Sequence, residues 1–229
     1  MDTSRTLAAL AAGLVLLAGC GGGDDSGSGG GSDAPETSAP PAAPFAPSED
    51  DQDPSERIEG VETVDYRGGT HADPGQRVAY DRHPPLGGAH DEVWASCNGV
   101  VYDRAVRTEN MVHALEHGAV WIAYDPDGLD EAAVTALAER VEGQPYLMLS
   151  PYPGMDTPIS VQSWGHQLKL DSPDDERIDQ FVQALRANPY TTPEPGAPCD
   201  IDPRAFDPTN PPPFDPSEPG PDAMPVNGN

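Results

Sequence analysis

The chain has 229 residues, a formal net charge of −27 and a single lysine, Lys169. A nucleic-acid-binding protein needs clustered Lys and Arg side chains to displace counterions from phosphates, so this composition excludes that class. Residues 20–57 are rich in Gly, Ser and Pro, and residues 200–229 are acidic and Pro-rich. We expect a disordered tether and a disordered tail there, because neither segment offers enough apolar surface to offset its ordering entropy. One globular domain remains, at residues 58–199.

Residues 1–19 have the features of a secretory signal peptide. Arg5 precedes an apolar run at residues 7–18, which is shorter than the roughly 20 residues needed to span a bilayer. The sequence LAGC at residues 17–20 resembles the lipobox of bacterial lipoproteins, in which the cysteine carries the lipid. We therefore expect cleavage before Cys20 and a lipid-anchored protein on the extracytoplasmic face of the cell membrane. The alternative is an ordinary signal peptide with a coincidental cysteine.

Two further cysteines, Cys97 and Cys199, lie in the expected mature protein. Free thiols are unusual outside the cytoplasm, so these two are expected to form a disulfide. The alternative interpretation makes Cys97 a nucleophile that is activated by a nearby histidine.

The first half of the domain combines short strands with irregular chain. Strands are predicted at residues 61–66 and 76–80, separated by a polar turn that contains glycines. Prolines and glycines make residues 82–96 irregular. A short helix follows, with Thr108 as its N-cap and Gly118 as its C-terminal stop.

The second half alternates strands and helices. The predicted elements are a strand at 119–124, an amphipathic helix at 130–142, a strand at 145–149, an extended stretch at 159–170, and a helix that Ser172 caps and that ends before Pro189. The first three elements suggest a right-handed crossover within one sheet. The fold class is α+β, or an α/β sandwich, with a small mixed sheet and two or three helices between disordered tails.

The densest chemical feature is the short helix that follows Thr108. His113 and His117 have i, i+4 spacing, which places both imidazoles on one face, where they can bind one metal ion. His90, in the irregular stretch, can supply a third ligand. The candidate ions are copper and zinc: a ligand from Met111 would favour copper, and one from Glu116 would favour zinc.

Three functions are compatible with this pattern. The first is a cell-envelope lipoprotein that binds copper or zinc through His90, His113 and His117. The second is a metal-free extracytoplasmic binding or scaffold module with an unknown protein partner, in which these histidines form hydrogen bonds in the core.

The third function is a metallohydrolase. Residues 113–117 match the H-x-x-E-H pattern of inverzincins, in which Glu116 would be the base, and Glu194 lies near the spacing of their third ligand. The prolines around Glu194 and the short chain argue against this function. The sequence contains no G-x-S-x-G elbow and no phosphate-binding loop, so we expect a binding protein rather than an enzyme.

Several longer motifs resemble one family. They are spaced residues from Tyr80 to Tyr102, HALEHGAVWIAY at 113–124, LSPYPGM at 149–155, SWGHQLKLD at 163–171 and TPEPGAPC at 192–199. Together they resemble the domain of unknown function 3105 of exported or membrane-tethered, mostly actinobacterial proteins. The resemblance implies such a location, with motif positions at His90, Cys97, His113, Glu116, His117 and Cys199. The family usually reads PPTSGPH where this chain reads PPLGGAH, at residues 84–90.

Overall fold

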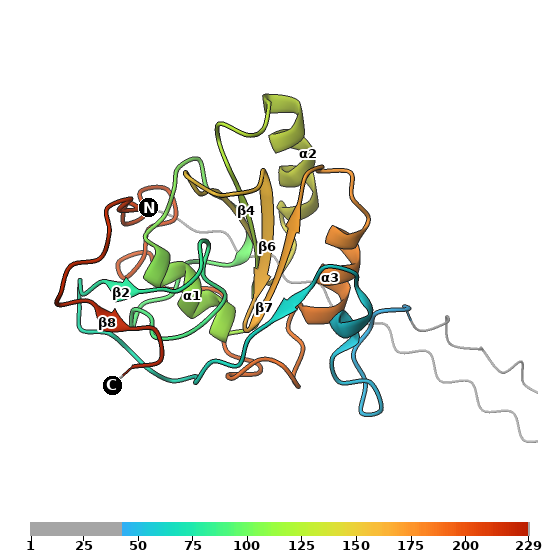
Figure 1. The fold of residues 1–229 in the computed structure, drawn as a ribbon, viewed down its shortest axis with the longest axis horizontal. Helices are drawn as coiled ribbons and strands as arrows, with labels where there is room; N and C mark the ends of the chain where they lie inside the picture. The colour runs from blue at the N-terminus through green and yellow to red at the C-terminus, as the bar shows by residue number, and fades with distance from the viewer. Residues whose placement is uncertain (1–42, 229) are drawn as a thin grey trace, which may run out of the picture. The chain divides into compact units, whose positions relative to one another are not determined.

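The structure is a computed structural model that describes residues 43–228. These residues form a six-stranded mixed sheet and a separate two-stranded sheet, together with three α-helices (Figure 1). The α+β fold class predicted from the sequence is confirmed. The expected signal peptide and Cys20 lie outside the described residues. Within them, no helix is long and apolar enough to cross a membrane.

The elements have the following bounds. The helices are a 3-10 turn η1 at Pro54–Arg57, α1 at Thr108–Glu116, α2 at Glu131–Val141 and α3 at Arg177–Leu185. The strands are β1 at Glu62–Thr63, β2 at Val78–Ala79, β3 at Asn98–Val101, β4 at Val120–Tyr124, β5 at Leu147–Pro151, β6 at Ile159–Ser163, β7 at His166–Leu170 and β8 at Met224–Pro225.

The large sheet has the strand order β1-β7-β6-β4-β5-β3. β3, β5 and β4 run parallel, and β4, β6, β7 and β1 pair in antiparallel fashion. Helix α2 connects the adjacent parallel strands β4 and β5, as the predicted crossover requires. The sheet therefore joins a parallel half to an antiparallel half along β4.

Both faces of β4 are buried, which explains its nearly continuous apolar sequence. Val120 and Ile122 belong to the core cluster that contains α2 and α3. Trp121 and Ala123 belong to the cluster that contains α1. Figure 1 shows the same arrangement, with α1 on one side of the strands and α2 and α3 on the other. Helix α1 is thus enclosed between the sheet and long loops.

Several predicted boundaries are corrected by the structure. Thr108 is the first residue of α1 and not its N-cap. Ser172 does not cap α3, because its hydroxyl accepts the amide N–H of Asp174 in a separate turn, and the helix begins only at Arg177. The extended stretch at 159–170 is a hairpin of β6 and β7, and β3 was not predicted.

The acidic tail is ordered in the structure, contrary to expectation. Phe206 is 1% exposed and packs in the core cluster of α1, and β8 pairs with β2. The guanidinium of Arg77 donates to the carbonyl oxygens of Asp215 and Ser217. The Pro-rich tail has no helical or strand periodicity. It is held instead by a few buried apolar side chains and by hydrogen bonds to its backbone carbonyls.

The last part of the expected tether, from residue 43 to 57, is also packed on the domain. The amide N–H of Phe45 donates to the side chain of Gln183 on α3. The carboxylate of Asp53 caps η1 and lies 3.0 Å from Nε2 of His166. These contacts place the start of the ordered domain earlier than residue 58.

The predicted disulfide between Cys97 and Cys199 is present. Both cysteines are almost fully buried, and the bond joins residues separated by 102 positions in the sequence. It fixes the loop that follows α3 against the chain that enters β3.

Candidate metal centre

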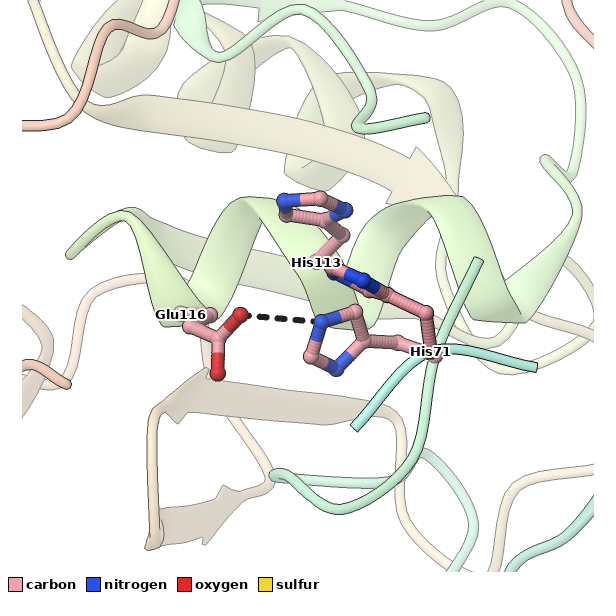
Figure 2. A group of neighbouring side chains, drawn as sticks. His71, His113 and Glu116 are labelled. Carbon is pink, nitrogen blue, oxygen red and sulfur yellow. Dashed lines mark ion pairs between the residues drawn. The ribbon is translucent and has the colours of Figure 1, made fainter. Parts of the chain in front are cut away.

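The last turn of α1 and its C-cap residue carry three polar side chains on one face. His113, Glu116 and His117 have i, i+3 and i+4 spacing, and all three are less than 5% exposed. Gly118, with φ of +95°, ends the helix directly after them. Figure 2 shows His113 and Glu116 projecting from this helix, with His71 approaching from a separate segment.

Two extended segments bring His71 and His90 side by side. The amide N–H of His90 donates to the carbonyl of Thr70 at 3.0 Å, and the two histidines form an isolated parallel bridge. Their rings lie 5.0 Å apart. The turn before His90 requires glycine: Gly88 has φ of +101°, and a Cβ there would lie 2.5 Å from Val226. The ordered tail therefore helps to position His90.

Four ligand atoms converge on one point, which we call the inner group. It consists of His71, His90, His113 and Glu116, whose ligand atoms all lie within 4.8 Å of one another. His90, His113 and Glu116 are buried, whereas His71 is exposed. The group therefore lies just below the surface, with His71 on its outer side.

Backbone carbonyls orient the buried imidazoles. Nδ1 of His90 donates to the carbonyl of Gly88 at 2.8 Å, and Nδ1 of His113 donates to the carbonyl of Asp91 at 2.6 Å. A carbonyl oxygen can only accept, so Nδ1 carries the proton, and the lone pair of a neutral ring is on Nε2. This second hydrogen bond is typical of metal-binding histidines.

Glu116 and His90 form a close, buried contact in which neither facing atom is hydrogen-bonded within the described part of the chain. Nε2 of His90 and Oε2 of Glu116 are 2.9 Å apart, and both side chains are fully buried. Among residues 43–228, neither atom has a hydrogen-bond partner of acceptable geometry. Two lone pairs in contact repel each other, and a proton on Nε2 would not point at the oxygen. A metal ion bound to both atoms would satisfy them.

The surroundings of His113 and Glu116 determine their charge at neutral pH. Burial lowers the pKa of His113 to about 3, and the neighbouring His90 reinforces the effect. Burial would raise the pKa of Glu116, but the amide N–H of Gly69 donates to Oε1 and helps to hold that pKa below its usual value. At neutral pH the helix therefore presents a neutral imidazole and a carboxylate, which is the state that binds cations.

A second set of ligand atoms, the outer group, lies next to the first. It consists of His113, His117 and Glu194, again within 4.8 Å of one another. Nε2 of His117 is 3.4 Å from Oε2 of Glu194, and Nδ1 of His117 donates to the carbonyl of Pro198. The Glu194 side chain is 47% exposed, so this group opens to solvent.

The predicted ligands are divided between the two groups. His90 and His113 converge in the inner group, whereas His117 lies in the outer group. Met111, considered as a copper ligand, is fully buried in the core cluster of α1. His71 was not among the predicted ligands, because only its pairing with the distant segment of His90 brings it to α1.

The comparison with known families agrees with the resemblance seen in the sequence. The family described as protein of unknown function (DUF3105) matches residues 71–201, which is more than half of the chain. The chain belongs to the DUF3105 family. The DUF3105 match includes every residue of both groups and both cysteines of the disulfide. No curated protein and no solved structure matches the chain.

Proposed function

We propose that this DUF3105 protein binds one divalent metal ion, preferably zinc, in the inner group. The observation that carries the proposal is the buried 2.9 Å contact of Nε2 of His90 with Oε2 of Glu116, neither of which has a hydrogen bond of acceptable geometry among the described residues. The protein holds the ion on the extracytoplasmic side of the membrane, where a lipid on Cys20 anchors it. His71 is the one exposed member of the inner group, so the ion lies just below the surface.

The donor set favours zinc over copper. Three imidazole nitrogens and one carboxylate oxygen can form a four-coordinate tetrahedral site, with bonds of about 2.0 to 2.2 Å. Ligand atoms on such an ion are roughly 3 to 3.5 Å apart, so rotation of the exposed His71 and small shifts of the other side chains close the group. The carboxylate of Glu116 among these ligands favours zinc, since copper prefers softer ligands such as a thioether.

The geometry supports a hydrolase less well. Glu194 does lie beside His113 and His117, as the inverzincin pattern requires of a third ligand. The base of that pattern, Glu116, is directed elsewhere: Oε1 accepts the amide N–H of Gly69, and Oε2 faces His90. A fully buried carboxylate whose oxygens face Gly69 and His90 is badly placed to receive a proton from water on a metal in the outer group.

Metal content is the direct test of the proposal. The full chain, stripped with a chelator, freed of any affinity tag and dialysed against zinc, is expected to retain about one zinc ion. Replacing a ligand should cost more than the roughly 10- to 100-fold in affinity that loss of a supporting hydrogen bond costs. We therefore expect His90→Ala and Glu116→Gln to lower zinc affinity by more than about 100-fold, measured by competition with a chromophoric chelator.

His83→Ala is the matched control for these variants, since His83 is a part-buried histidine that contacts Tyr152 and belongs to neither group. It is expected to bind zinc as the wild type does. A folded wild-type chain that retains neither zinc nor copper above background would favour the metal-free binding module instead.

The lipid anchor gives a separate prediction. A diacylglycerol on Cys20 would bury many methylene groups in the bilayer, each worth about 0.8 kcal/mol, so wild-type protein is expected in the membrane fraction. Cys20→Ala is expected to leave an unlipidated precursor or to release the protein, as measured by fractionation and mass spectrometry. Full-length wild-type protein found without lipid in the culture fluid would contradict this.

A further inference from the structure

We propose that the metal ion enters the inner group by way of the outer group, with His113 as the ligand that carries it across. This inference rests on the proposed function and adds the route by which the site is loaded. It assigns a role to His117 and Glu194, which the inner group leaves unused.

His113 is common to the two groups and can serve only one ion at a time. Its Nδ1 donates to the carbonyl of Asp91, so Nε2 is the single ligand atom that it offers. Two ions cannot share one imidazole nitrogen. The two groups are therefore alternative positions of one ion and not a two-metal site.

Burial gives the route its direction. The Glu194 side chain is 47% exposed, whereas His90 and Glu116 are completely buried. An ion in solvent can therefore reach the carboxylate of Glu194, whereas it cannot reach the buried carboxylate of Glu116 directly. His71 is also exposed, but its ring stacks on that of His113 at 5.2 Å and covers the inner group from that side.

The backbone fixes the two groups relative to each other. The amide N–H of Glu194 donates to the carbonyl of Glu116 at 3.2 Å, so the outer carboxylate is attached to the helix end that bears the inner one. Trp94 packs on the rings of both His113 and His117, at 5.4 and 4.7 Å between centroids. These contacts hold the ligands of the two groups in fixed positions, which favours direct exchange between ligands over release into solvent.

The transfer is a ligand exchange that conserves charge. The bonds to His117 and Glu194 break, bonds to His90, Glu116 and His71 form, and the bond to His113 persists. One carboxylate replaces another, and no electron or proton is transferred. The inner group offers four ligands and the outer group three, so the ion is more stable in the inner group.

The experiment compares how fast and how tightly the stripped full chain takes up cobalt(II), whose visible absorption reports its coordination. Glu194→Gln is expected to slow loading by about ten-fold or more, the scale on which a local carboxylate affects cation capture. Equilibrium affinity should stay unchanged. The matched control is Glu92→Gln, an exposed carboxylate outside both groups, whose loss changes net charge equally and should leave the rate unchanged.

Each other outcome overturns a defined part of the inference. Loading of Glu194→Gln at the wild-type rate would show entry past His71 and reject the route. Loss of equilibrium affinity in the same variant would make Glu194 a ligand of the resting site, and two cobalt ions per wild-type chain would exclude a shared His113. The first outcome leaves the proposed function intact, whereas the second would move the resting ion out of the inner group alone and the third would change the number of ions bound. A wild-type chain that takes up no cobalt and no zinc would overturn both.

Discussion

Reduction of the Cys97–Cys199 disulfide is expected to lower the free energy of unfolding by about 4 to 5 kcal/mol, because the bond closes a loop of roughly 100 residues in the unfolded chain. Both cysteines are buried, so we expect reduction to change the free energy of the native state little and to act mainly on the unfolded chain. Urea unfolding of the full chain, oxidised and reduced, measures the difference. A chelator should be present throughout, since thiol reductants and zinc bind each other.

The double variant Cys97→Ala, Cys199→Ala is the control for this experiment. Its stability should match that of the reduced wild type to within the cost of the substitutions, and reductant should leave it unchanged. A reduced wild type that loses less than about 1 kcal/mol would mean that the unfolded chain keeps structure across this loop.

Phe206→Ala is expected to destabilise the protein by about 3 to 5 kcal/mol, the usual cost of emptying a buried phenylalanine site. Phe206 is 1% exposed, and its ring lies edge-on to Tyr102 at 6.3 Å in the core cluster of α1. Chemical unfolding of the two proteins measures the change. A disordered tail, as expected from composition, predicts no effect at all.

Tyr190→Ala is the matched control, because Tyr190 is an aromatic residue with 42% of its surface exposed. Surface substitutions of this kind usually change stability by no more than about 0.5 kcal/mol. If both variants had equally small effects on stability, the result would support the disordered tail that composition predicts.

Local sequence patterns accounted for much of the fold around the site. The i, i+4 spacing placed His113 and His117 on one helical face, and the structure has both there. Helix α2 follows its apolar periodicity closely, with Asp130 as its N-cap. Such patterns are readable because backbone hydrogen bonds in a helix join residues four apart, so neighbours in sequence decide the outcome.

The division of the site into an inner and an outer group could not be predicted from local sequence patterns. Glu116 and His117 are adjacent in sequence, yet one faces His90 and the other faces Glu194. Which partner each residue meets depends on where two distant loops close over α1. Spacing along one helix limits the ligands to a face of that helix but does not choose among loops.

The sequence by itself determined the α+β class, the helices, the family resemblance and the pairing of Cys97 with Cys199, because each depends on local periodicity, a motif or a count of cysteines. Tertiary structure alone decided that His71 joins the inner group and that the acidic tail is ordered. His71 is placed by pairing with the segment of His90, and the tail by burial of Phe206. These are long-range contacts whose free energy comes from surfaces that exist only after the sheet and α1 have assembled.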